Sequence, residues 1–529
     1  MTHQFGKRIV KNTQKLKRKR GTYGPKISRL IEIEPKSDKK RKQTYNDFII
    51  VPSNLPKINI NKFKANALRE NSLDDLVKNY DNRPTPTEFL DLYEIKEEYC
   101  KVRNQKRSPT CWIYSLIGFY EMIFNKEYLK LEEEEEESEE LNKKNTDENK
   151  KSVKKRLTSK NNTLIKKVIK TKVTHLGEND KFLFSPKYVF FFHIYEQTNK
   201  CLNRIRRHLH HETPRLHDDF IEVLFNPIEY GGFEDDFTII THKYGLVPEH
   251  EYPSSKHSWD SDELEQTCTS ILKMAFNELI YSNSKKHDKI HQKTLKTMFH
   301  TLVMFLGQPP KKISLWRKNI KVNDITPLDF YHDFSPIKTN ELVVLIHRSD
   351  KTDGVYKAHE NWRNTTREEN TKGFEKRLNI RYRYITNYIK KSIDNQIPVP
   401  FACDVSRDHD IYKGYSDVSL YQFYEYLEIP FEVTRKSVFN TYDRWGPHAM
   451  TIVGYYVDKR NPDKNIVMWK VMNSWGKSIG KEGFIDMKAE WMEFNSMSFH
   501  INKDFLNASH LDMFENSQPK IMEKNDFFQ

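Results

Sequence analysis

A run of apolar side chains at helical spacing directly follows Cys111, and it constrains the fold more than any other segment of the chain. The run comprises Trp112, Ile113, Leu116, Ile117, Tyr120, Ile123 and Phe124. Residues that recur three and four positions apart lie on one side of a helix, and a helix this apolar must be buried. The pattern therefore predicts a core helix with the Cys111 thiol in its first turn.

Two later segments are predicted to be strands rather than helices. Residues 448–457 (HAMTIVGYYV) and 466–473 (IVMWKVMN) are short, apolar and rich in β-branched or aromatic residues, and the turn sequence DKRNPDKN joins them. This pattern is typical of an antiparallel hairpin. Further helices are predicted at 184–205 and at 289–306, the latter ended by Gly307 and Pro309-Pro310. The chain is therefore expected to be an α+β protein.

The composition supports a folded core and argues against a membrane protein. Only 37% of the residues are hydrophobic, but the chain has 27 Tyr, 32 Phe and 8 Trp, which can build a large core. No apolar stretch approaches the roughly 18 residues that a membrane span requires. The first residues, MTHQFGKRIVKNTQKLKRKR, contain no apolar segment of a secretory signal. We therefore expect an intracellular, cytoplasmic protein without a membrane partner.

The net charge of +14 belongs mainly to the first 42 residues. That segment holds 15 Lys and Arg against three acidic residues, so the remaining chain is almost neutral. Residues 1–84 are predicted to be a basic, flexible extension. It either solubilises the chain or, through clusters such as Lys17–Arg20 and Lys39–Lys42, binds nucleic acid or an acidic partner or directs the protein to the nucleus.

A second charged segment runs from about residue 126 to residue 180. It begins with LEEEEEESEE and turns basic near KKVIKTK. Such low-complexity sequence is poor in core residues, so we interpret it as a surface loop inserted into the folded domain, with a charged helix as the alternative.

The cysteines favour a reducing compartment and single out one thiol. An odd and sparse set of five has neither disulfide-framework nor zinc-finger spacing, so we expect no metal and no cofactor. Cys111 lies at a helix start, where backbone N–H groups favour a thiolate. His448 and Asn473 lie on the two strands of the hairpin, where imidazole and amide can meet. Gln105 precedes the thiol and can donate to an oxyanion.

Each of these residues taken alone has an ordinary interpretation: an inert core thiol, a structural histidine, a turn asparagine and a surface glutamine. Together they resemble the papain-type cysteine peptidases. The similarity rests on Gln105, Cys111-Trp112, His448-Ala449, Asn473-Ser474-Trp475-Gly476, Gly480 and Gly483-Phe484, in that order.

The resemblance implies a papain-like two-lobed fold with large insertions. A helical lobe would carry Cys111, and an antiparallel β-barrel-like lobe would carry His448 and Asn473. Cys111 would be the nucleophile and His448 the general base and acid, ion-paired with the thiolate. Asn473 would orient the imidazole, and Gln105 would help form the oxyanion hole. The supporting or cleft residues would be Trp112, Gly231, Gly232 and Trp475, the last shielding the contact between His448 and Asn473.

Two departures from the papain pattern point to one branch of the superfamily. Ser108 stands where the usual signature has a disulfide-forming cysteine, and no cysteine precedes Gly231-Gly232. His448 lies 337 residues after Cys111, against roughly 130–150 in secreted relatives. The bleomycin hydrolase (aminopeptidase C) branch is cytosolic and has long insertions. Stretches such as FSPKYVFFFHIYE, LGQPPKK and PVPFACDV are similar to it, within about residues 85–510.

This branch implies an aminopeptidase that assembles as a hexamer and places its C-terminal arm, here residues 511–529, in the cleft. The arm's carboxylate would bind the α-ammonium of a peptide substrate. The ending NDFFQ differs from the family's, so a papain-like endopeptidase is an alternative. A pseudo-peptidase scaffold with a nucleic-acid-binding tail is another. The Lys-, Asn- and Ile-rich composition also fits an AT-rich genome, which leaves packaging in the particle of a large DNA virus as an alternative location.

Overall fold

The computed structural model describes residues 61–79, 86–144, 181–209, 218–228, 230–317, 320–334, 341–357, 376–431, 433–441, 446–461, 463 and 465–522. The chain divides into two units. One contains Met1–Tyr80 and Tyr421–Pro430, and the other contains Asp81–Leu420 and Phe431–Gln529. The predicted basic segment 1–42 and residues 145–180 of the charged segment lie outside the described residues.

The first unit joins two short N-terminal helices to a distant segment of the chain. Its helices are α2 (Lys62–Glu70), α3 (Leu73–Val77) and α14 (Phe423–Tyr426). Asn61 caps α2 by accepting hydrogen bonds from the N–H groups of Phe63 and Lys64. The Gln422 N–H donates to the Val77 carbonyl at 2.8 Å, which links the two segments of this unit.

The helical lobe of the second unit is built around the predicted core helix. Its elements are α4 (Cys111–Lys144), α6 (Pro186–His208), α7 (Asp218–Phe225), α8 (Glu234–Tyr244), α9 (Lys256–Trp259), α10 (Asp262–Tyr281), α11 (His287–Leu306), β2 (Ile313–Arg317), β3 (Ile320–Ile325) and α12 (Pro327–Phe334). Ser185 caps α6 by accepting from the Tyr188 N–H, and Gly307 ends α11 with φ +86°. Both helices confirm the sequence prediction.

The second lobe is a sheet with helices packed on it. Its strands are β1 (Leu90–Glu94), β4 (Leu342–Ile346), β5 (Gly354–Lys357), β6 (Lys376–Asn379), β7 (Val399–Asp404), β8 (His409–Asp410), β9 (Tyr415–Ser416), β10 (Pro447–Asp458), β11 (Ile466–Met472), β12 (Phe484–Lys488), β13 (Ser496–Asn502) and β14 (Lys520–Ile521). Its helices are α13 (Tyr382–Asp394), α15 (Arg435–Thr441), α16 (Ala489–Asn495) and α17 (Ala508–Asn516).

In the described part of the chain these strands form one 12-stranded sheet in the order β14-β5-β6-β4-β13-β7-β10-β11-β12-β9-β8, with β1 added to β10. Most pairs are antiparallel, and the pairs β4–β6, β5–β14 and β9–β12 are parallel. The predicted hairpin is confirmed as β10 and β11, which pair antiparallel from Thr451–Met472 to Val457–Ile466.

Strand β10 is long enough to pair with several neighbours at once. Its first half, from Pro447 to Ile452, pairs with β7, and its second half, from Gly454 to Asp458, pairs with β1. Its other edge pairs with β11. The start of β10, where His448 lies, is therefore held by its pairing with β7.

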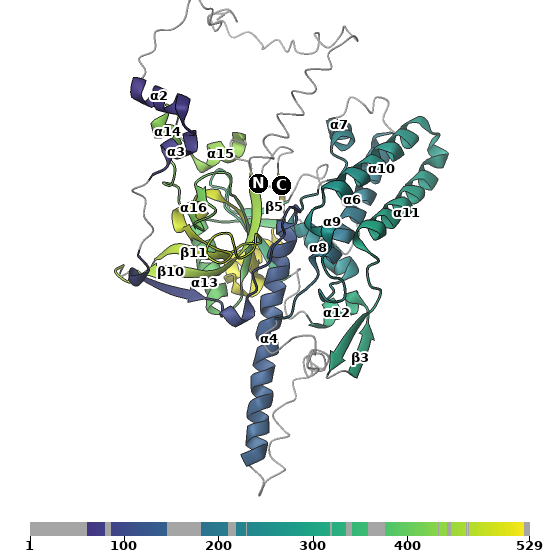
Figure 1. The fold of residues 1–529 in the computed structure, drawn as a ribbon, viewed down its shortest axis with the longest axis horizontal. Helices are drawn as coiled ribbons and strands as arrows, with labels where there is room; N and C mark the ends of the chain where they lie inside the picture. The colour runs from purple at the N-terminus through teal and green to yellow at the C-terminus, as the bar shows by residue number, and fades with distance from the viewer. Residues whose placement is uncertain are drawn as a thin grey trace, which may run out of the picture. The chain divides into compact units, whose positions relative to one another are not determined.

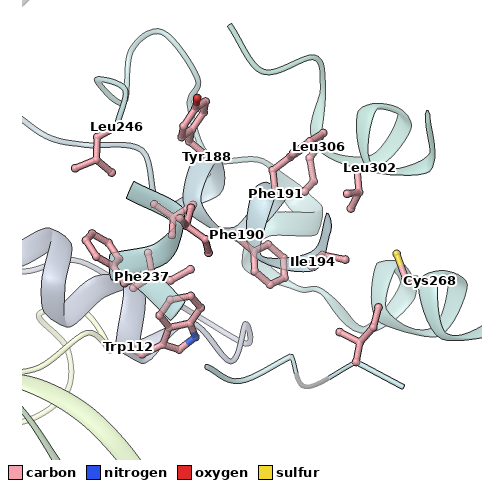
Figure 2. Close-up of a cluster of buried hydrophobic side chains, with 14 of the residues drawn as sticks. Trp112, Tyr188, Phe190, Phe191, Ile194, Phe237, Leu246, Cys268, Leu302 and Leu306 are labelled. Atoms are coloured by element: carbon pink, nitrogen blue, oxygen red, sulfur yellow. The ribbon is translucent and has the colours of Figure 1, made fainter. Parts of the chain in front are cut away.

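Helix α4 lies between the two lobes. Figure 1 shows it running between strands β10 and β11 and helices α6 and α8, and it packs against β10, α6 and α8. The helical lobe has an aromatic core, in which Figure 2 shows Trp112 beside Phe190 and Phe237. A second core, which includes Trp469 and Trp491, fills the sheet lobe. This is the α+β, two-lobed papain-like arrangement that the sequence predicted.

The charged segment begins as a helix, because α4 continues through the acidic run to Lys144. The helical alternative therefore holds for residues 126–144.

Candidate active site

Cys111 is the first residue of α4, at the junction of the lobes. The N–H groups of Ile113 and Tyr114 donate to the Thr110 carbonyl at 3.0 and 3.1 Å, so the helix starts at the thiol. The first N–H groups of a helix have no acceptor within the helix, and together with the helix dipole they favour negative charge. The half-buried Cys111 side chain thus lies where a thiolate is stabilised.

Reciprocal hydrogen bonds fasten the first turns of α4 to β10. The Ser115 hydroxyl, one turn after Cys111, donates to the Met450 carbonyl at 2.6 Å. The Thr451 hydroxyl returns a bond to the Ser115 carbonyl at 3.0 Å. His448 lies on the same strand, two residues before Met450. These bonds fix the start of β10, with its imidazole, against the start of α4, with its thiol.

The His448 imidazole and the Asn473 amide are joined by a buried hydrogen bond of 2.8 Å between Nε2 and Oδ1. The Ser474 N–H also donates to this Oδ1, at 2.7 Å, which fixes the orientation of the amide. Because Oδ1 can only accept, Nε2 of His448 must carry the proton. The second ring nitrogen, Nδ1, is therefore the unprotonated one in the neutral imidazole, and it is the nitrogen able to take a proton.

Trp475 covers this hydrogen bond. Its ring stacks on the His448 imidazole with centroids 4.4 Å apart and an interplanar angle of 19°. His448 is only 6% exposed. Burial lowers the pKa of His448 to about 4, and the hydrogen bond with Asn473 opposes the shift. Burial thus favours the neutral form of this imidazole.

The segment before Cys111 pairs with the segment after β11, which brings Gln105 beside Asn473. The Gln105 N–H donates to the Ser474 carbonyl at 2.8 Å, and the Gly476 N–H donates to the Arg103 carbonyl at 3.0 Å. Gly476 has φ +82°, and a Cβ on it would lie 2.6 Å from the amide of Asn104. A side chain at this position would separate the two segments.

The Gln105 side chain is buried and held at both ends of its amide. The Ser474 hydroxyl donates to Oε1 at 2.6 Å, and Nε2 donates to the Ser108 carbonyl at 2.8 Å. An amide nitrogen carries two hydrogens, so one remains to be donated elsewhere. Ser474 and Ser108 thus fix the orientation of the Gln105 amide.

A buried ion-pair network around Arg103 anchors the segment that precedes Cys111. Arg103 contacts Glu121 of α4 at 2.5 Å and also Glu249, and it donates to the Phe184 carbonyl at 3.1 Å. Burial raises the pKa of Glu121 to about 7, against the opposing charge of Arg103. No local sequence pattern predicts this network, because its members lie far apart in the chain.

Gly232 is in contact with Trp112, the residue after the thiol. A Cβ on Gly232 would lie 2.5 Å from the indole, whereas a Cβ on Gly231 would meet no atom within 4 Å. Gly232 is thus a glycine because the indole lies against its backbone. Gly231 is exposed, and nothing in its surroundings requires a glycine.

Two groups beside His448 were not predicted. Cys403 on β7 is the direct cross-strand partner of His448, and burial raises the pKa of its thiol. His409 on β8 is hydrogen-bonded through Nδ1 to the Ser416 hydroxyl at 2.7 Å. Burial, and to a smaller extent the nearby His448, lower the pKa of His409 to about 4. The polar Ser115 within an apolar helix was the one signal in the sequence that could have indicated a tie between the lobes.

All five cysteines lie among the described residues, and no disulfide joins any two of them. Within the described ranges, no three His, Cys, Asp or Glu side chains gather as a metal site would require. In the same part of the chain, no helix combines the length and the apolar character needed to cross a membrane.

The fold and the site residues define the class of protein as a papain-like cysteine peptidase. The sequence model of the Peptidase C1-like family matches residues 121–527, and the chain belongs to that family. The match begins after Gln105 and Cys111, so the placement of these two residues comes from the structure itself.

The curated relatives of this chain include proteins that are named aminopeptidases. Aminopeptidase C of Lactococcus lactis subsp. cremoris is 27% identical over 354 residues, which is 65% of this chain and 78% of the relative. Aminopeptidase E of Lactobacillus helveticus is 24% identical over 477 residues, which is 86% of this chain and 92% of the relative.

A solved structure, PepW from Lactobacillus rhamnosis HN001, has the same fold. It superposes with a TM-score of 0.68 at 20% identity and covers 87% of this chain and 93% of its own.

Proposed function

We propose that this chain is a cysteine aminopeptidase in which Cys111 is the nucleophile, His448 the general base and acid, Asn473 the residue that orients the imidazole, and Gln105 an oxyanion donor. The observation that carries the proposal is the buried bond between His448 Nε2 and Asn473 Oδ1. It leaves Nδ1 as the basic nitrogen, on a strand that Ser115 ties to the helix of Cys111.

The unpaired nitrogen of the Asn473 amide also supports a catalytic role for this residue. Its Nδ2 is buried and makes no hydrogen bond with any described residue. Leaving a buried donor unpaired costs about 1–3 kcal/mol, so an asparagine is a poor choice for stability alone at this position. The cost is understandable if the residue is kept for the bond that its oxygen makes to His448.

The reaction follows from these positions. As the Cys111 sulfur attacks the carbonyl carbon of the substrate, His448 Nδ1 takes the thiol proton. The oxyanion that forms is stabilised by Gln105 Nε2 and the Cys111 backbone N–H. Collapse of the intermediate breaks the C–N bond, and His448 returns the proton to the leaving amine. Water, deprotonated by His448, then hydrolyses the thioester and releases the acid product.

The C-terminal region is held at one end of the sheet. After α17, strand β14 pairs in parallel with β5, and the Met522 N–H donates to the Lys357 carbonyl at 2.9 Å. Met522 is buried with Ile346 and Tyr356 of the sheet lobe. We propose that the C-terminal arm, residues 511–529, restricts the cleft and selects substrates with a charged α-ammonium group, as the resemblance to the bleomycin hydrolase branch implies.

The test compares aminoacyl-coumarin substrates with peptides whose amino group is blocked. The full chain should hydrolyse the former and leave the latter intact, and Cys111→Ser should hydrolyse neither. A variant that ends at Met522 should gain activity on blocked peptides. Hydrolysis of blocked peptides by the full chain at a comparable kcat/KM would instead establish an endopeptidase.

We also propose that residues 1–42 bind nucleic acid, on the basis of their excess of 15 basic over three acidic residues. The full chain should bind double-stranded DNA with a log K that falls as log salt rises, and deleting residues 1–42 should abolish this binding. Binding that survives the deletion would assign it to the folded part. Assembly as a hexamer and a cytoplasmic location stay predictions, which light scattering and imaging of the tagged chain would check.

A further inference from the structure

The loop that carries Gln105 contains a residue in an unfavourable backbone conformation. Lys106 has φ +52°, the left-handed region that residues with a Cβ rarely adopt. Its N–H donates to the Asn104 side-chain oxygen at 2.8 Å. Such a conformation costs on the order of 1 kcal/mol and persists only when the surroundings hold it. The turn at Lys106 directs the chain from Gln105 toward Cys111, so what holds this residue also sets the position of the Gln105 amide.

Trp259, at the end of α9, holds the turn from outside the papain motif. The Lys106 ammonium lies 3.9 Å from the centroid of its ring, within the range of a cation–π contact. The next residue, Arg107, donates its N–H to the Trp259 carbonyl at 2.9 Å. The Arg107 guanidinium adds exposed ion pairs with Asp260 at 3.5 Å and Asp262 at 3.4 Å, which contribute little.

Contacts of the neighbouring residues hold Trp259 in place. The Ser255 N–H donates to the Ser258 hydroxyl at 2.8 Å, which donates to the Ser255 carbonyl at 2.9 Å and closes the turn. The His257 ring packs on Phe305 of α11 with centroids 4.8 Å apart. Helix α10 starts three residues after Trp259. The side chain is half-buried, so it is held without being part of the deep core.

The loop has no covalent tether that would make this contact redundant. Ser108, which stands at the disulfide position of the papain signature, is buried and donates to the Gln105 carbonyl at 2.8 Å. Its hydroxyl also lies 2.6 Å from that of Thr110. The Gln105 loop is therefore held by noncovalent contacts, with Ser474 on one side and with Trp259 on the other.

We propose that Trp259 is a positioning residue for the reaction: it holds the left-handed turn at Lys106 and thereby aims the Gln105 amide at the oxyanion. The proposal rests on the function assigned above, because it presumes that Gln105 donates to the oxyanion. It assigns a role to a segment that the papain motif does not contain. A merely structural role for Trp259 would lower stability without a selective effect on the step that forms the oxyanion.

The test measures kcat and KM on an aminoacyl-coumarin for Trp259→Ala, Trp259→Phe and Met274→Ala. Met274 is 65% exposed on α10 and serves as the matched control. Removing an oxyanion donor lowers kcat about 100-fold, so Gln105→Ala should do so, and misplacing the donor should cost about tenfold. Trp259→Ala is thus expected to lower kcat about tenfold with KM within about twofold, whereas Trp259→Phe and Met274→Ala stay close to wild type.

A second measurement separates the oxyanion from the thiol. Alkylation of Cys111 by iodoacetamide displaces iodide and forms no oxyanion, so its rate should be the same in Trp259→Ala and in the wild type. Lys106→Met removes the same contact from an exposed side chain without opening a cavity, and it should lower kcat about threefold. The urea midpoint of each variant reports whether it is folded.

The double variant Gln105→Ala/Trp259→Ala tests whether Trp259 acts through Gln105. If Trp259 acts through Gln105, the double variant has the kcat of Gln105→Ala alone. A further tenfold loss in the double variant, or wild-type kcat in Trp259→Ala, would overturn the proposal. Neither result would touch the proposed function, which fails separately if Cys111→Ser keeps peptidase activity.

Discussion

The two halves of the site are held by different means. His448 lies on strand β10 in register with Cys403 of β7, and Asn473 directly follows β11, so regular strand pairing sets where both residues lie. Cys111 and Gln105 lie on a helix start and an irregular loop, and side-chain contacts hold them. The imidazole half is therefore rigid by its secondary structure, and the thiol half depends on individual contacts that single substitutions can remove.

The largest expected effect tests whether the halves act as one unit. Cys111→Ala and His448→Ala should each lower kcat/KM by about 10⁴-fold or more, and the double variant should lose no more than either single variant. The measurement is steady-state hydrolysis of an aminoacyl-coumarin, with circular dichroism to confirm folding. Losses that multiply in the double variant would mean that the two residues do not share a step.

A smaller effect is expected on the imidazole side. Asn473→Ala removes the bond to His448 Nε2 and frees the ring to rotate, and misorientation of this kind costs about 100-fold in kcat. The stack of Trp475 on the imidazole is retained in this variant, so KM should change little. The control is Trp475→Phe, which keeps an aromatic cover and should lose less. An Asn473→Ala enzyme with wild-type kcat would show that strand pairing alone orients the imidazole.

The two neighbouring glycines offer a matched pair on the thiol side. Gly232→Ala forces a Cβ to 2.5 Å from the Trp112 indole, and overpacking of this kind destabilises by about 2 kcal/mol. Gly231→Ala meets no atom within 4 Å and should be neutral. Urea midpoints of the two variants check this. Equal midpoints would contradict the close contact between Gly232 and Trp112.

The helix after Cys111 and the β10–β11 hairpin could be predicted because their signals are local: helical spacing in one segment, two apolar strands around a turn in the other. The sequence motif placed His448 and Asn473 on adjacent strands of one hairpin, and the structure joins the two side chains by a hydrogen bond. The motif could not predict the order of the sheet, whose pairs such as β4–β13 and β7–β10 join distant segments. Nor could it predict the contact of Lys106 with Trp259, because no spacing rule connects a loop to a turn some 150 residues later.

The smallest expected effect concerns acid stability. Burial lowers the pKa of His347, His409 and His448 to about 4 each, from 6.5. Between pH 4 and pH 6.5 the native state thus binds fewer protons than the unfolded chain, so the free energy of unfolding falls as the pH falls through this window. Glu121, with a pKa of about 7, acts in the opposite direction because its contribution falls as the pH rises from 4.5 to 7.

Three histidines outweigh one carboxyl, so the net loss between pH 6.5 and pH 5.5 should be about 1–2 kcal/mol. Urea unfolding at the two pH values measures it. A protein that is more stable at pH 5.5 would contradict the burial of these imidazoles.

The central claim is that one thiol among five is set up to react. Cys100, Cys201, Cys268 and Cys403 are buried, and burial raises the pKa of Cys100 and Cys268 to about 12. The most direct measurement treats the folded chain at pH 7 with an epoxide thiol inhibitor of the E-64 type and locates the adduct by peptide mass spectrometry. We predict one adduct, on Cys111, with peptidase activity lost in proportion to labelling. Labelling at another cysteine, or full activity with Cys111 modified, would contradict the account.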